Sequence, residues 1–284
     1  MSENKDLILV IGGTGKTGRR VVERLEARGL PVRIGTPRST PPFDWLDPST
    51  WAPAVEGVES AYVAYHSDLT FGGAPDRVRA FADVAVKNGV RHLVLLSGRN
   101  EPGAHLAEQA VQESGADWTI VRSSFFAQDF SEYFWREDVL NGEVAFPAGN
   151  TKEPFIDVED IADVAAAALM DERHRNQLYE VTGPRLLTFH DAVAEISTAI
   201  GREVRYVPIS ADEFASALAE SGMPPEEVTE FVDLFTMILD GRSEYLSDGV
   251  KRALGREPRD FSDFARDAAA SGAWDVPAES AARR

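Results

Sequence analysis

Residues 7–18 read LILVIGGTGKTG, and this stretch decides the fold. An apolar run ends in three evenly spaced glycines, Gly12, Gly15 and Gly18, and an amphipathic segment follows at once. This order predicts a buried strand, a tight turn and a helix. Glycines suit such a turn because they allow unusual backbone conformations, the approach of a phosphate and close packing of helix on strand. The N–H groups at the start of the helix favour a pyrophosphate, so the stretch indicates a dinucleotide site.

The turn has two other interpretations. The letters GKT at 15–17 resemble the end of a P-loop, but that motif would require its first glycine at position 10. Val10 stands there, inside the predicted strand, so the P-loop interpretation fails. The remaining alternative is a glycine-rich turn that binds no ligand.

Composition limits the classes of partner. The chain has 284 residues, 43% of them hydrophobic, and a formal net charge of −18, which disfavours nucleic acid and anionic membranes as partners. It has no apolar run long enough to span a membrane, and its first residues lack the apolar stretch of a signal peptide, so a cytoplasmic location is expected. The absence of cysteine excludes disulfides, thiolate metal sites and a cysteine nucleophile. No metal site is predicted.

Strands and helices alternate through the first half of the chain. After the first strand and helix, strands are predicted at 31–35, 59–65, 91–96 and 117–122, and helices at 75–88, 103–114 and 125–140. This alternation predicts an α/β fold with a doubly wound parallel sheet. Ligands of such sheets bind beyond the carboxyl ends of the strands.

The second half is less regular. A helix is predicted at 157–170, a strand at 178–182, a helix from Thr188 to Ile200, a strand at 203–207, two helices within 211–240 broken at 222–225, and a last helix at 260–271. We therefore expect a dinucleotide-binding core at 1–150, with 155–185 completing the sheet. A smaller, mostly helical lobe at 186–275 would cover the substrate, and 276–284 would form a tail, disordered from 277 onward.

The residues after the second predicted strand favour NADP over NAD. An NAD site usually has an acidic residue there, but residues 35–39 read GTPRS and contain only Arg38 as a charged group. A guanidinium can bind a 2′-phosphate through two hydrogen bonds. The alternative is a solvated surface arginine. Asp44, slightly further on, is placed to contact the adenine amino group, or is a plain turn residue.

The Tyr-x-x-x-Lys pair of many nicotinamide enzymes is absent. None of the five lysines has a tyrosine four residues before it. His105, on the helix expected to carry the pair, is a candidate proton donor or an ordinary exposed histidine. Ser97, directly after a predicted strand, is placed to hydrogen-bond the substrate or the nicotinamide amide, or caps the following turn.

Several stretches together resemble the NmrA-like branch of the atypical short-chain dehydrogenases/reductases. They are VIGGTGKTG at 10–18, LLSGR at 95–99, AEQAV at 107–111, DWTIVRSSFFAQ at 117–128, PFIDVEDIADVA at 154–165 and YEVTGP at 179–184. The resemblance covers about 10–200. It implies a Rossmann domain with a small helical lobe and NADP(H) in the groove between them.

The resemblance also implies roles for individual residues. The pyrophosphate would be lined by Gly12, Thr14, Gly15, Lys16 and Thr17, with Gly18 in the same turn and Arg38 at the 2′-phosphate. Ala64 and Tyr65 would lie along the adenosine. Ser97 and residues 123–126, which include Ser123 and Phe125, would surround the nicotinamide.

The first functional hypothesis is an NADPH-dependent reductase of a small apolar compound, aromatic or quinone-like. Phe126 and Phe130, spaced by four on a predicted helix, would face the substrate pocket together with Phe231 and Phe235. The alternative for these rings is core packing. Members of the branch include non-catalytic redox sensors, and a tailoring isomerase or cyclase is not excluded. The expected partner is a small-molecule substrate, and a homodimer is left open.

Overall fold

The computed structural model describes residues 7–275, so the predicted tail lies outside the described residues. The chain divides into two compact units, each assembled from several segments. The sheet unit comprises the chain up to Ser123, Val158–Val181 and Ser247–Glu257, and the aromatic unit comprises Ser124–Asp157, Thr182–Leu246 and the chain from Pro258. This division differs from the contiguous domains expected above: residues 124–150 belong to the aromatic unit and 247–257 to the sheet unit.

The sheet unit contains a six-stranded parallel sheet in the order β2-β1-β3-β4-β5-β8. Its strands are β1 (Leu7–Ile11), β2 (Val32–Gly35), β3 (Val58–Val63), β4 (His92–Gly98), β5 (Asp117–Ser123) and β8 (Gln177–Val181). Strands β1, β3 and β4 are mostly buried, and so is the middle of β5, as expected for a parallel sheet that is covered on both faces. The predicted doubly wound α/β fold is confirmed.

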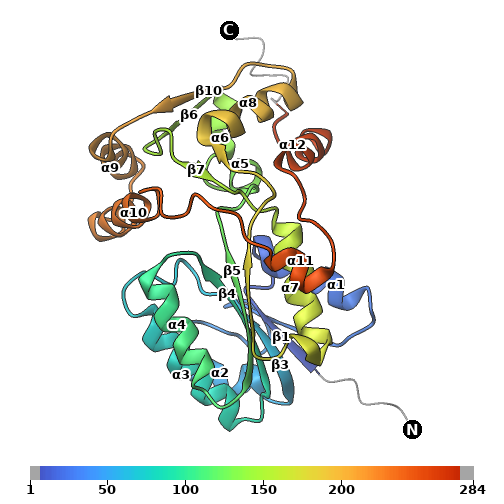
Figure 1. The fold of residues 1–284 in the computed structure, drawn as a ribbon. Helices are drawn as coiled ribbons and strands as arrows, with labels where there is room; N and C mark the ends of the chain where they lie inside the picture. The colour runs from blue at the N-terminus through green and yellow to red at the C-terminus, as the bar shows by residue number, and fades with distance from the viewer. Residues whose placement is uncertain (1–6, 276–284) are drawn as a thin grey trace. The chain divides into compact units, whose positions relative to one another are not determined.

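Helices cover both faces of this sheet (Figure 1). One face carries α2 (Trp51–Val55), α3 (Ala74–Lys87) and α4 (Pro102–Gln112), and the other carries α1 (Lys16–Glu26), α7 (Val158–Met170) and α11 (Gly249–Leu254). Two short 3₁₀ helices, Pro48–Thr50 and Glu172–His174, precede α2 and β8. Alternate residues of the strands point to opposite faces, so Leu93 and Leu95 of β4 join the core beneath α3 and α4.

The aromatic unit holds two small sheets and six helices within the described residues. Strand β6 (Glu143–Phe146) pairs in parallel with β10 (Arg205–Pro208), and β7 (Lys152–Glu153) pairs antiparallel with β9 (Leu187–Thr188). The helices are α5 (Asp129–Glu132), α6 (Arg136–Asn141), α8 (Phe189–Ile200), α9 (Ala211–Glu220), α10 (Pro225–Ile238) and α12 (Phe261–Ala270). The predicted helix starting at Thr188 is confirmed, with a complete capping box to Asp191. The predicted break before α10 is confirmed as well.

The predicted helix at 125–140 is wrong. Phe126 forms an isolated parallel bridge with Ile156, whose N–H donates to the carbonyl of Phe125 at 2.8 Å. These hydrogen bonds keep the chain extended, and helix begins only at Asp129. It stops again at Tyr133, whose φ of −149° is not helical, so two short helices replace one long one. Periodicity alone could not reveal this, because the competing partner comes from a distant segment.

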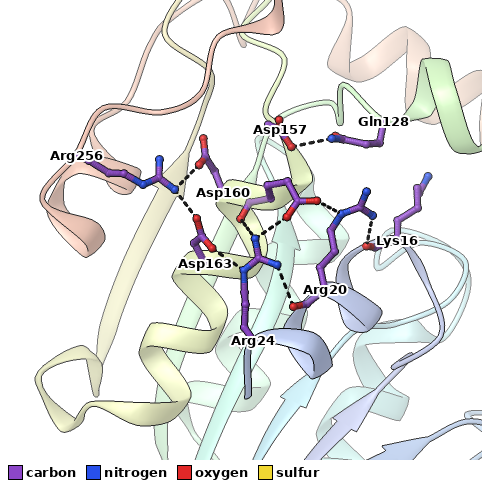
Figure 2. Close-up of polar contacts among 9 residues, drawn as sticks. Lys16, Arg20, Arg24, Gln128, Asp157, Asp160, Asp163 and Arg256 are labelled. Atoms are coloured by element: carbon purple, nitrogen blue, oxygen red, sulfur yellow. Dashed lines mark hydrogen bonds and ion pairs between the residues drawn. The ribbon is translucent and has the colours of Figure 1, made fainter. Parts of the chain in front are cut away.

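Ion pairs hold α1 to α7 within the sheet unit (Figure 2). Arg24 donates to Glu159 at 2.6 Å and to Asp163 at 2.5 Å, and Arg20 donates to Glu159 as well. Arg20 also donates to the carbonyl of Lys16 at 2.8 Å, in the first turn of α1. Burial alone would raise the pKa of Glu159, but its hydrogen bonds from Arg24 and Arg20 hold the pKa below the ordinary value. The start of α1 is therefore fixed by charge-assisted hydrogen bonds.

A further arginine extends this network. Arg256, just after α11, donates to Asp160 at 2.6 Å and to Asp163 at 2.5 Å (Figure 2). Asp160 is fully buried, so this ion pair compensates a carboxylate that has been removed from water. The same figure shows a hydrogen bond of the aromatic unit, from the Gln128 amide to Asp157 at 2.7 Å.

A neutral histidine is built into the sheet. Thr119 donates to the carbonyl of His174 at 2.7 Å, so its oxygen accepts the bond of 2.9 Å from Nε2 of His92. Burial, then the positive charge of Arg175 and the neighbouring His174, lower the pKa of His92 to about 4, while Asp117 opposes the shift. The folded chain therefore favours the neutral form of His92.

This histidine should make stability depend on pH. Between pH 6.5, the ordinary value of histidine, and about pH 4 the unfolded chain takes up a proton that the folded chain refuses. The free energy of unfolding should therefore decrease as the pH is lowered through this range, by up to about 3 kcal/mol for this one group. Denaturant titrations of wild type and His92→Gln at several pH values measure the difference. Equal pH slopes in the two proteins would contradict the assignment.

Candidate cofactor and active site

The glycine turn after β1 leaves no room for a side chain at Gly18. Gly12 has a φ of +71°, and its N–H donates to the carbonyl of Gly35 at 2.9 Å, which joins the turn to the end of β2. A Cβ on Gly18 would lie 2.2 Å from the carbonyl oxygen of Gly12. That contact is with backbone and cannot be relieved by rotating a side chain. The start of α1 therefore packs directly on the turn, as a dinucleotide site requires.

The tip of the turn is open to solvent. Thr14 and Gly15 are exposed and Lys16 is partly exposed. Gly15 is the N-cap residue of α1 and offers no side chain for capping, which leaves the positive end of this 11-residue helix to a phosphate. The buried hydroxyl of Thr17 accepts a hydrogen bond of 2.9 Å from Tyr62. The place of Thr17 at the pyrophosphate stays a prediction.

Arg38 lies beside this turn with its charge unpaired. It sits in a tight loop in which the Ser39 hydroxyl donates to the carbonyls of Thr36 and Pro41, both at 2.8 Å. Arg38 is exposed, and its guanidinium makes no hydrogen bond or ion pair with any other residue between 7 and 275. Because β1 and β2 are neighbours with Ile11 opposite Gly35, this loop adjoins the glycine turn. An ordered backbone therefore presents a free cation beside the uncapped N-terminus of α1.

The residues expected along the adenosine have structural roles as well. Oδ1 of Asp44 accepts from the N–H of Leu46 at 2.8 Å, which confirms its role in a turn and leaves the adenine contact a prediction. Ala64 follows β3 and faces the glycine turn, where a Cβ on Gly12 would lie 3.5 Å from its own Cβ. The Tyr65 hydroxyl accepts from Arg77 at 3.0 Å.

Ser97 belongs to a buried polar network at the ends of β4, β5 and β8. Its hydroxyl donates to Glu108 of α4 at 2.6 Å, and Arg122 grips the same carboxylate with bonds of 2.9 and 2.5 Å. Glu180 links Arg122, at 3.6 Å, to the buried Arg99, at 3.2 Å. The Ser97 proton is thus committed to Glu108, so toward a ligand this hydroxyl acts as an acceptor.

The two other predicted residues of the sheet unit lie close by. The buried Ser123 hydroxyl donates to the carbonyl of Ser97 at 3.2 Å. His105 lies in the first turns of α4, and its Nε2 is buried without a hydrogen-bond partner among the described residues. Gln109, four residues further on, is exposed. The catalytic role of His105 stays a prediction.

Sequence reasoning missed a pair of carboxyl groups at the same edge of the sheet. Asp68 follows β3, and Glu101 follows β4 directly before α4. Their loops touch, since a Cβ on Gly103 would lie 2.5 Å from Cα of Thr70. The Thr70 hydroxyl lies 3.5 Å from the Glu101 carboxyl. A single acidic residue in a loop forms no sequence pattern that would predict a site. Asp68 and Glu101 come together only because β3 and β4 are neighbours in the sheet.

In the aromatic unit, the predicted pocket residues fall into two groups. Phe130 is fully buried among other rings, including Trp135 at 4.7 Å, and its carbonyl accepts from Trp274. The expectation that Phe130 faces a pocket is corrected: it is a core residue, because it does not share a helix face with Phe126. Phe126 itself is partly exposed.

The second group forms a row of neighbouring rings. Phe125 stacks on Phe235 with centroids 5.9 Å apart, and Phe231 stacks on Phe235 at 6.1 Å. Phe134 contacts both Phe231 and Phe235. Phe125, Phe134 and Phe231 remain partly exposed, whereas Phe235 is nearly buried. The row therefore offers an apolar aromatic surface.

The parallel sheet, the glycine turn and the open helix terminus define a nicotinamide dinucleotide-binding protein of the α/β class. A sequence profile of the NAD(P)H-binding family matches residues 12–172, more than half of the chain. The chain belongs to this family and is an NAD(P)-dependent oxidoreductase. No helix among residues 7–275 is long and apolar enough to span a membrane.

Relatives extend over nearly the whole chain. NAD(P)H azoreductase of Xenophilus azovorans is 34% identical, over 93% of this chain and 99% of the relative. Agroclavine dehydrogenase of Claviceps fusiformis is 33% identical, over 92% and 96% respectively. An NADPH-dependent quinone oxidoreductase of Escherichia coli, solved with NADPH, has a similar fold with a TM-score of 0.77 at 20% identity, covering 92% of this chain and 99% of that one.

The glycine contacts give a testable difference between two substitutions. Gly18→Ala should force α1 away from the turn, destabilise the protein by about 1–3 kcal/mol and abolish NADPH binding, because a backbone clash has no local remedy. In Gly15→Ala the new methyl would lie 3.2 Å from the Gly12 oxygen in an exposed position, so the fold should survive while binding weakens. Thermal unfolding and NADPH fluorescence titration measure both effects. A Gly18→Ala protein that binds NADPH normally would refute the packing argument.

Proposed function

We propose that this protein is an NADPH-dependent reductase of a small apolar acceptor, aromatic or quinone-like, which works without a Tyr-Lys pair. The observation that carries the cofactor preference is Arg38, an exposed and unpartnered guanidinium on an ordered loop beside the glycine turn. A planar guanidinium suits the 2′-phosphate that distinguishes NADPH from NADH. No acidic residue stands at the end of β2 to repel that phosphate.

The protein residues bind and orient the cofactor, which supplies a hydride. The N-terminus of α1 and the backbone of Gly12–Thr17 would hold the pyrophosphate, and Arg38 would hold the 2′-phosphate. Ser97, with its proton directed at Glu108, is suited to accept a hydrogen bond from the nicotinamide amide. Positioning of donor and acceptor supplies most of the rate for a quinone, because the reduced product delocalises its charge.

The aromatic row supports the class of acceptor. The partly exposed rings of Phe125, Phe134 and Phe231 provide a flat apolar surface that suits an aromatic compound. The names of the relatives agree with this class, since they include an azoreductase and a quinone oxidoreductase. Together these observations favour a dye or quinone over a small hydrophilic substrate.

Turnover is tested by adding NADPH and following the absorbance of the reduced nicotinamide with a panel of quinones, azo arenes and triarylmethane dyes. Saturable oxidation that disappears in Gly15→Trp supports the reductase. Tight NADPH binding with no oxidation by any acceptor would overturn the proposal and favour a non-catalytic redox sensor.

The assignment of Arg38 predicts a change in cofactor preference. Arg38→Ala should weaken NADPH binding about tenfold to a hundredfold, the loss of a charge-assisted hydrogen-bond pair, and leave NADH binding nearly unchanged. Arg28→Ala, which removes an exposed arginine at the other end of α1, is the matched control. Titration of both cofactors with all three proteins gives the comparison, and equal losses for NADPH and NADH would refute the role.

A further inference from the structure

The side chain of Glu101 packs against the carboxyl end of β4, in the space left open by Gly98. A Cβ on Gly98 would lie 2.1 Å from both oxygens of the Glu101 carboxyl, so this group occupies the space that any other residue at position 98 would fill. Glu101 is the N-cap residue of α4, but its side chain makes no capping bond to the helix. The carboxyl is instead turned back to the strand end, with the Thr70 hydroxyl at 3.5 Å.

The surroundings of Glu101 favour its protonated form. Burial first, then the negative charges of Asp68 and Glu108, raise the pKa of Glu101 well above the ordinary value, against the opposing hydrogen bond from Thr70. Asp68 faces it from the loop after β3, and burial raises the pKa of that carboxyl too. Two titratable groups of α4 follow Glu101 along the chain: His105 in the first turn of the helix and Glu108 in the next turn.

The Glu101 carboxyl lies at the edge of the sheet where ligands of such folds bind. In parallel α/β sheets, ligands bind beyond the carboxyl ends of the strands, and Glu101 follows the last residue of β4 by three positions. Ser97, proposed above to orient the nicotinamide, is the penultimate residue of the same strand. Glu101 as a whole is partly exposed, so a substrate can reach its loop.

We propose that Glu101 is the proton donor of the reductase, for acceptors whose reduction leaves a basic anion. This inference rests on the proposed function. For an azo arene, the hydride from reduced nicotinamide forms an N–H bond with one nitrogen, and the π pair of the N=N bond moves to the other nitrogen. That nitrogen takes the proton from the Glu101 carboxyl, whose O–H bond breaks. The product is the hydrazine, and the Glu101 carboxylate recovers a proton from water.

A cationic triarylmethane dye provides the internal control, because hydride addition to the carbocation gives a neutral product and needs no proton. In Glu101→Gln, kcat for an azo arene should fall about a hundredfold, the usual contribution of general acid catalysis. The rate with the triarylmethane cation and the affinity for NADPH should stay within about twofold of wild type by the same reasoning. Glu113→Gln, at the far end of α4, is the matched control for loss of an acid on this segment and should alter neither rate.

Two further variants separate a chemical role from a structural one. Gly98→Ala places a methyl where the carboxyl sits, so it should also impair azo reduction selectively. Asp68→Asn removes one of the charges that favour protonated Glu101, so the decline of azo reduction with rising pH should shift to lower pH. Infrared spectroscopy of the protein without turnover should show the carbonyl band of a protonated carboxylic acid at neutral pH, absent in Glu101→Gln.

Each outcome decides the role of Glu101. Equal losses of both rates in Glu101→Gln would show a structural role, and an unchanged azo rate would exclude proton donation; both overturn the proposal. A selective azo loss in His105→Gln, with Glu101→Gln intact, would transfer the role to the histidine. If no acceptor in the panel supports NADPH oxidation by the wild type, the proposed function is overturned, and the role of Glu101 as proton donor is overturned with it. An active wild type with an unaffected Glu101→Gln overturns the donor alone.

Discussion

The close contact between Gly18 and the carbonyl of Gly12 is the constraint on which the site depends. It places the first turn of α1 directly on the turn after β1, and a single methyl group would separate them. Arg20 and Arg24 then fix the helix to α7 through Glu159. The positive end of α1 is therefore held by backbone packing below and by ion pairs along its side. A phosphate site built in this way is rigid before any ligand arrives.

The chain has a net charge of −18, yet its cofactor is anionic. Arg20 and Arg24 of α1 are neutralised by acidic partners on α7, so they add little positive field. Arg38 differs, because no described residue pairs with it. In the proposed site, selectivity for an extra phosphate would depend on one local cation and a helix terminus, because the charge of the whole chain matters little at the short range of these contacts.

The sequence predicted those features that local chemistry decides. The apolar run before Gly12, the alternation of strands and helices, the cap at Thr188 and the break before α10 all lie within short windows and match the structure. The helix at 125–140 failed because Phe125–Ala127 pairs with Ile156, a distant segment, and Phe130 then joined the core. Glu101 and Glu108 were invisible for a similar reason: their roles arise from contacts with other loops and strands, which only the sheet order creates.

In its proposed role, Glu101 would replace the proton donor of the missing Tyr-Lys pair, with its pKa shifted in the opposite direction. In that pair a lysine lowers the pKa of a phenol, which brings a weak acid toward neutrality. Here burial and the negative charge of Asp68 raise the pKa of a stronger acid well above its ordinary value. A cation near the reacting atoms would favour loss of the proton from a carboxyl, so a site that uses a carboxylic acid gains from having no lysine. The absence of the pair and the presence of a partly exposed acid that does not cap its helix are thus consistent parts of one arrangement.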